Sequence, residues 1–154
     1  MQLIKRLALV LLVVFLAIQF IRPVRNINPA VLSTDITKLV SVPEKVSAIL
    51  KHSCYDCHSN NTRYPWYMNI QPMGWVMADH IKDGKKDLNF SEFGSYSLRK
   101  QTNKLSAIED VLQENEMPLS SYLILHRSAK LSDADKQLIV AWVAAAKETI
   151  DKKD

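Results

Sequence analysis

Residues 54–58 read Cys54-Tyr55-Asp56-Cys57-His58, a C-x-x-C-H motif, and this stretch determines how the rest of the chain is interpreted. Two thiols three positions apart at the end of a helix can reach the two vinyl groups of one haem and form thioethers. The imidazole of His58 then lies beneath the iron and binds it as the proximal ligand. The motif therefore predicts one covalent haem c, held by Cys54 and Cys57.

Other uses of a C-x-x-C pair fit this chain less well. The sequence has two cysteines, both in the motif, whereas a zinc site needs a second pair or two suitably spaced histidines. A thioredoxin-like redox pair expects a βαβ setting, which the sequence does not indicate. A disulfide across two residues would be strained. Haem attachment is the favoured interpretation.

A second iron ligand is expected on a loop that follows a predicted helix. Met117-Pro118 lies there, and the last helix begins about fifteen residues later, which is where small cytochromes c place the distal thioether. A thioether raises the reduction potential and favours electron transfer over oxygen chemistry. Met117 could instead fill a gap in the core, and His126 could ligate the iron or bond a haem propionate. The weaker candidates lie on helix faces or too near the attachment point, and they are Met73, Met77, His80 and His52.

An apolar run precedes the motif by some thirty residues. Residues 7–21 contain Gln19 as their one polar side chain, with Lys5 and Arg6 before them and Arg22-Pro23 after. Fifteen residues make a helix of roughly 22 Å, short for a hydrocarbon core of roughly 30 Å, but basic side chains can snorkel to the headgroups. No good cleavage site follows. Residues 1–25 are therefore predicted to be an uncleaved transmembrane signal anchor.

The basic excess of the chain belongs to this anchor. The formal net charge is +4, and four of the 20 basic residues flank the apolar run, so the remaining 16 balance the 16 acidic ones. We therefore expect no nucleic-acid partner. Because haem of this type is attached outside the cytoplasm, we expect a single-pass protein of the bacterial inner membrane whose haem domain faces the periplasm.

The rest of the chain reads as a linker and a small all-α domain. Residues 26–42 carry turn signals and are predicted to be a linker with at most a short turn of structure. Residues 43–154 are predicted to form a cytochrome c-like haem-binding domain, with helices over 43–54, 72–84 and 97–115 and a last one from Ser132, whose capping box includes Asp135. Neither an alternating strand nor a repeat is evident. The aromatic side chains expected to pack on the porphyrin or in the core are Trp66, Tyr67 and Trp75.

With these residues in place, the chain resembles the bacterial haem-binding domain family, relatives of monohaem cytochromes c. The resemblance runs from about Val40 to Ala146. It is carried by Cys54-x-x-Cys57-His58-Ser59-Asn60, Thr62, Pro65-Trp66-Tyr67, Pro72, Glu116-Met117-Pro118, Tyr122, His126, Leu131-Ser132 and Trp142, with an anchor that ends in Gln19-Phe20-Ile21-Arg22-Pro23 before Asn26. It implies covalent haem c and an all-helical fold.

The function expected from these features is that of a membrane-anchored electron carrier. A monohaem c-type cytochrome takes an electron from one redox protein and passes it to another, so we expect redox partners, no catalytic residues and no enzymatic activity. Two rivals stay open. One is a haem-based enzyme or gas sensor with a displaceable distal ligand, and the other is a haem subunit of a larger respiratory complex.

Overall fold

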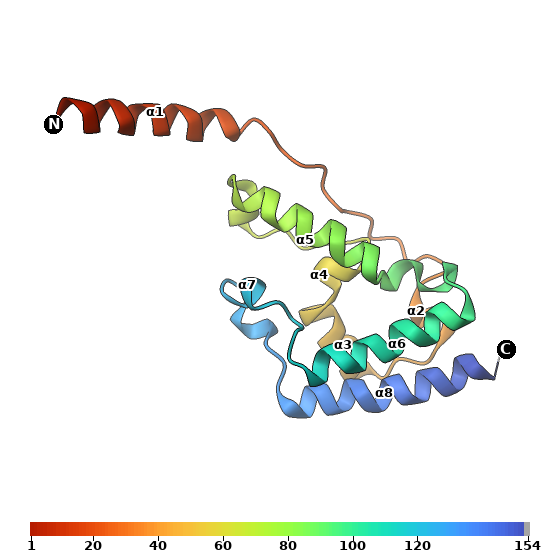
Figure 1. Cartoon of the computed structure of the whole chain (residues 1–154). Helices are drawn as coiled ribbons and strands as arrows, with labels where there is room; N and C mark the ends of the chain where they lie inside the picture. Colours follow the sequence, from red (N-terminus) through yellow and green to blue (C-terminus); the bar gives the residue numbers. More distant parts are fainter. Residues whose placement is uncertain (153–154) are drawn as a thin grey trace.

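The computed structural model describes residues 1–152, and these residues are helical with irregular connections (Figure 1). The all-α prediction is confirmed, since an isolated bridge between Ile27 and Asn61 is the only β pairing within residues 1–152. The α-helices in chain order are α1 Gln2–Ile18, α2 Ile36–Leu39, α3 Glu44–Ser53, α4 Tyr55–His58, α5 Met73–Asp87, α6 Leu98–Gln113, α7 Ser120–Leu123 and α8 Asp133–Asp151, and the short 3₁₀ helices are η1 Trp66–Asn69, η2 Phe90–Ser95 and η3 Arg127–Ala129.

The main core lies where α3, α6 and α8 meet. Helices α6 and α8 pack along each other, as Figure 1 shows, with apolar positions at helical spacing facing inward. Helix α8 begins with the predicted capping box, because the Ser132 hydroxyl accepts from the backbone N–H of Asp135 and the Asp135 carboxylate accepts from the backbone N–H of Ser132. Phe90 and Phe93 of η2 close this core from the side.

A second, smaller apolar cluster lies outside the main core and packs η1, α5, α7 and η3 together. It consists of Met68, Met77, Tyr122 and Ala129, which come from η1, α5, α7 and η3. Helix α5 also packs against α4, so the attachment motif lies between the two clusters. This arrangement holds the C-x-x-C-H turn from both sides.

Residues 26–42 take part in the packing of the domain. Asp35 caps α2 by accepting from the N–H of Thr37 at 2.9 Å. Ile36 and Val40 on this segment are buried in the main core. The segment forms one short helical turn, α2, as expected, and in addition its two apolar side chains cover one side of the core.

Helix α1 stands clear of the domain in Figure 1 and has no buried residue. Its side chains are almost all apolar. Within residues 1–152, the structure has no helix with the length and apolar character needed to cross a membrane.

Candidate haem-binding site

The attachment motif is a tight turn between two helices. Cys54 ends α3, where its N–H donates to the Leu50 carbonyl at 2.9 Å, and it also precedes α4. The carbonyl of Cys54 then accepts from the N–H groups of Cys57 at 3.2 Å and His58 at 3.0 Å. These bonds place two thiols and an imidazole on one short helical turn. The two thiols are not bonded to each other.

The surroundings of the thiols oppose the alternative uses of the pair. Burial, together with the neighbouring Cys57, raises the pKa of Cys54 to about 12. Burial, together with Asp56, raises the pKa of Cys57 to about 11. A redox or metal-binding cysteine instead needs a lowered pKa, because the thiolate is the reactive species. Within residues 1–152, the structure contains no group of three or more His, Cys, Asp or Glu side chains that could hold a metal ion.

His58 is held in one orientation by the loop after α5. Its Nδ1–H donates to the carbonyl of Leu88 at 3.0 Å, so the lone pair of the neutral ring lies on Nε2. Burial lowers the pKa of His58, which keeps the imidazole neutral. A metal-binding histidine commonly has its second nitrogen fixed by a carbonyl in this way. The ring is therefore oriented for a ligand at Nε2.

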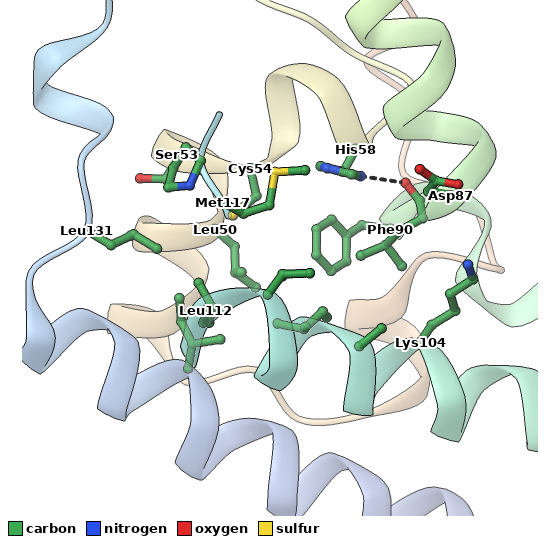
Figure 2. A pocket seen from close by; sticks show the side chains of 16 residues that line it. Leu50, Ser53, Cys54, His58, Asp87, Phe90, Lys104, Leu112, Met117 and Leu131 are labelled. Carbon is green, nitrogen blue, oxygen red and sulfur yellow. Dashed lines mark hydrogen bonds between the residues drawn. The ribbon is translucent and has the colours of Figure 1, made fainter. Parts of the chain in front are cut away.

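A cavity of about 290 Å³ lies next to this imidazole. Figure 2 shows His58, Cys54 and Met117 around it, with the thioether of Met117 extending toward the His58 ring. The walls are mostly apolar and come from α3, α6, α8 and the segment after α5; they include Leu50, Leu88, Phe90, Ile108, Val111, Leu112 and Ile139. Lys104 and Asp87 line it as the charged residues. An apolar cavity with a thiol, an oriented imidazole and a thioether on its surface fits the requirements of haem c.

Met117 reaches the cavity because α6 stops just before it. Asn115 adopts φ 60°, and the N–H of Glu116 donates to the Val111 carbonyl at 2.9 Å, which together form a Schellman cap. Asparagine tolerates this left-handed conformation better than most residues. The cap turns the chain so that Met117 and Pro118 line the cavity. The role of Met117 as an iron ligand stays a prediction.

His126, the alternative distal ligand, has other partners. Its Nε2 and the hydroxyl of Tyr67 are joined by a hydrogen bond of 2.6 Å. Its ring stacks on Tyr122, with centroids 3.9 Å apart. It is not among the described residues that line the cavity. The structure therefore separates His126 from Met117 and His58.

The weaker candidates also lie elsewhere. His52 is exposed on α3, and Met73 is exposed at the start of α5. Met77 is buried in the second cluster, and His80 has a buried Nδ1 without a hydrogen-bond partner within residues 1–152. None of the aromatic residues expected to pack on the porphyrin lines the cavity; Phe90 does so instead.

Gly84 of α5 lies in close contact with Cys57 of α4. The sequence predicts a helix that ends at this glycine, but α5 continues through it to Asp87. A Cβ at Gly84 would lie 2.8 Å from the carbonyl oxygen of Cys57 and 3.0 Å from its Cβ. The glycine therefore serves the close approach of α5 to α4, which a side chain at this position would prevent.

A polar network behind the motif was not anticipated. The buried carboxylate of Asp56 accepts from the N–H of Arg63 at 3.1 Å, from the Arg63 guanidinium and from the hydroxyl of Tyr122 at 2.9 Å. Burial and the adjacent Asp56 raise the pKa of Tyr122. The sequence holds no direct signal for this network, because an aspartate between two cysteines is ordinarily read as exposed. The network fixes the turn that carries both thiols.

Comparison with known proteins agrees with this site. The family described as "haem-binding domain" matches residues 13–145, and the chain belongs to this family. Residues of the chain are 32% identical over 109 positions to the cytochrome c peroxidase Ccp of Escherichia coli (strain K12). The match covers 68% of this chain but 23% of that protein. No solved structure matches the chain.

The relative overturns one expectation. The sequence reading predicted no enzymatic activity, and that prediction is wrong as a flat statement, because the relative is named as an enzyme. Because the chain spans about a quarter of the relative's length, the activity of the whole relative is not established for it.

Proposed function

We propose that this member of the haem-binding domain family carries one covalent haem c and transfers electrons through it. In this proposal Cys54 and Cys57 form the thioethers, His58 is the proximal ligand and Met117 is the distal ligand. The observation that carries the proposal is that Met117, His58 and Cys54 line one apolar cavity. When bound, the haem supplies a one-electron couple whose potential depends on its axial ligands and on burial.

The residues of the chain contribute orientation and exclusion of water. The carbonyl of Leu88 fixes the His58 ring, so little reorientation is needed on ligation. The apolar walls keep water away and favour a high reduction potential. The thioether of Met117 needs no deprotonation, so we expect its bond to persist over a wide range of pH.

The covalent part of the proposal can be tested on purified protein. A pyridine haemochrome spectrum should identify haem c, and a denaturing gel should retain haem staining. Replacing both thiols, Cys54→Ala with Cys57→Ala, should abolish the staining. A double variant that still stains would refute covalent attachment.

Enzymatic turnover is the second candidate, favoured by the similarity to a cytochrome c peroxidase. A haem enzyme needs an iron position that a substrate can reach, and a tightly bound Met117 closes that position. The two candidates differ in their response to cyanide. A rapid spectral change when cyanide is added to the oxidised wild-type protein would favour the enzyme, as would consumption of hydrogen peroxide by the protein in the presence of an added electron donor. A spectrum that changes with cyanide only in Met117→Ala would favour the electron carrier.

We also infer that α1 attaches the domain to a bacterial inner membrane, with the haem domain on the periplasmic side. The support is the apolar surface of α1, on which no residue is buried, and the basic side chains of Lys5, Arg6 and Arg22. Membrane fractionation with an N-terminal sequence of the product tests this attachment. Soluble protein that begins near Asn26 would refute it. The redox partners are proteins of unknown identity, and stable co-purification with a respiratory complex would indicate a subunit role.

A further inference from the structure

The C-terminal end of α1 is fixed to the domain by hydrogen bonds. The side-chain amide of Gln19 accepts from the N–H of Gln71 at 2.9 Å and donates to the carbonyl of Gln71 at 3.2 Å. The indole N–H of Trp75 donates to the carbonyl of Ile21 at 2.8 Å. Figure 1 shows the helix leading into this junction at the start of α5. A membrane that holds α1 would therefore also bring the start of α5 to its surface.

Large apolar side chains are exposed around this junction. Phe20 is 89% exposed, Val24 97% and Trp66 74%. Ile70, directly after η1, and Met73 and Val76, in the first turn of α5, are also exposed. Exposed apolar groups of this size, gathered at one place, commonly mark an interaction surface. Phe20 and Val24 follow α1 directly in the chain, and hydrogen bonds join the end of α1 to Gln71 and Trp75, so this set lies next to the apolar helix.

The junction is also positively charged. A small hollow of about 100 Å³ is lined by Arg22 and Arg25 from the segment after α1, together with Asn69, Gln71 and Gly74. The guanidinium of Arg25 bonds to the side chain of Asn69 and lies over the ring of Tyr64. Within residues 1–152, neither arginine forms an ion pair with a carboxylate.

The sequence explains why these charges stay uncompensated. Residues 1–34 and residues 57–78, which form the junction, contain no aspartate or glutamate. Arg63 is the one lysine or arginine in residues 57–78, and its carboxylate partner is Asp56. Arg22 and Arg25 are therefore left as cations beside exposed apolar groups.

We propose that this junction is a docking surface for the anionic headgroup layer of a phospholipid bilayer. Phosphate groups would pair with Arg22 and Arg25 at the hollow, while Phe20, Val24 and Trp66 enter the interfacial layer. A protein partner would not explain why the patch continues into α1. The inference rests on the attachment of α1 proposed above and adds that the haem domain lies on the membrane in one orientation.

The test uses the full-length holoprotein in nanodiscs of phosphatidylcholine, with or without phosphatidylglycerol. Hydrogen–deuterium exchange over residues 66–76 should be slower in the discs that contain phosphatidylglycerol. Each arginine replaced by glutamine, Arg22→Gln or Arg25→Gln, should lower the ratio of docked to free domain by about fivefold. The matched control is Arg99→Gln, which removes the same charge from an exposed position on α6 and should change nothing.

The outcomes separate this inference from the proposal on which it rests. Equal exchange in both kinds of disc, or equal effects of Arg25→Gln and Arg99→Gln, would overturn the docking surface while leaving attachment by α1 intact. Loss of the protein from both kinds of disc would overturn attachment, and docking with it. Slower exchange that depends on phosphatidylglycerol and on both arginines is the result that the proposal requires.

Discussion

Replacing Gly84 by alanine should destabilise the protein even though it improves a helix. Alanine in a helix interior is about 1 kcal/mol more favourable than glycine. Against this, the new Cβ would lie 2.8 Å from the carbonyl oxygen of Cys57 and 3.0 Å from its Cβ. Overpacking costs about 1–3 kcal/mol, and the upper part of that range applies because backbone must move. We expect a net loss of about 1–2 kcal/mol.

The assay is thermal unfolding of the holoprotein followed by circular dichroism. The loss corresponds to a fall in melting temperature of about 2–4 °C per kcal/mol. The control is Asp83→Ala on the exposed side of the same helix, which gains helix propensity without a clash and should be stabilising by about 0.5 kcal/mol. If Gly84→Ala stabilises the protein as Asp83→Ala does, the close approach of α4 and α5 is not the reason for this glycine.

Two further predictions concern polar contacts. Tyr122→Phe removes a bond to the buried carboxylate of Asp56 and should cost about 1.5–3 kcal/mol, more than Arg63→Gln, whose side chain is 60% exposed. The pKa of Tyr122 is raised in the folded protein, so the stability that its neutral hydroxyl contributes is present below pH about 10 and is lost as the pH rises above that value. Tyr122→Phe should therefore make the loss of stability at alkaline pH less steep. A larger cost for Arg63→Gln than for Tyr122→Phe would contradict the importance given to the bond between Tyr122 and Asp56. Ser132→Ala should cost about 1 kcal/mol by removing the cap of α8. Since the bond from Ser132 lowers the pKa of Asp135, the wild-type advantage should shrink as the pH falls through the pKa of that carboxyl, and a constant difference in acid would count against the capping box.

Local signals predicted much of the fold. Helix starts that carry their own marker were predicted closely: the helix expected from residue 43, a proline, begins as α3 at Glu44, and Ser132 caps α8. Helix ends were harder. Gly84 looks like a terminator, but its role depends on Cys57 in another helix, and no local pattern reveals a contact made across the fold. The packing of residues 26–42 was not predicted for the same reason, because Ile36 and Val40 are buried against distant helices.

The candidate site also has a part that the sequence predicts and a part that only the fold reveals. The C-x-x-C-H turn is contiguous, so its residues can be read directly from the sequence. Met117 could be proposed because a Met-Pro pair after a helix marks a loop. The carbonyl of Leu88, the wall formed by Phe90 and the bond from Tyr122 to Asp56 come from chain segments far from the motif. Packing decides these contacts, and local propensity carries no information about them.

The near-infrared charge-transfer band of the oxidised holoprotein tests the central claim most directly. A sulfur ligand from methionine produces this band, so the wild-type protein should show it. Met117→Ala should keep its covalent haem but lose the band and lower the reduction potential, because the weakly donating sulfur no longer stabilises the reduced iron. His126→Ala should leave both unchanged, since His126 lies with Tyr67 and Tyr122 and not at the cavity. If the losses fall on His126→Ala and spare Met117→Ala, the iron has two histidine ligands and the proposed site is wrong.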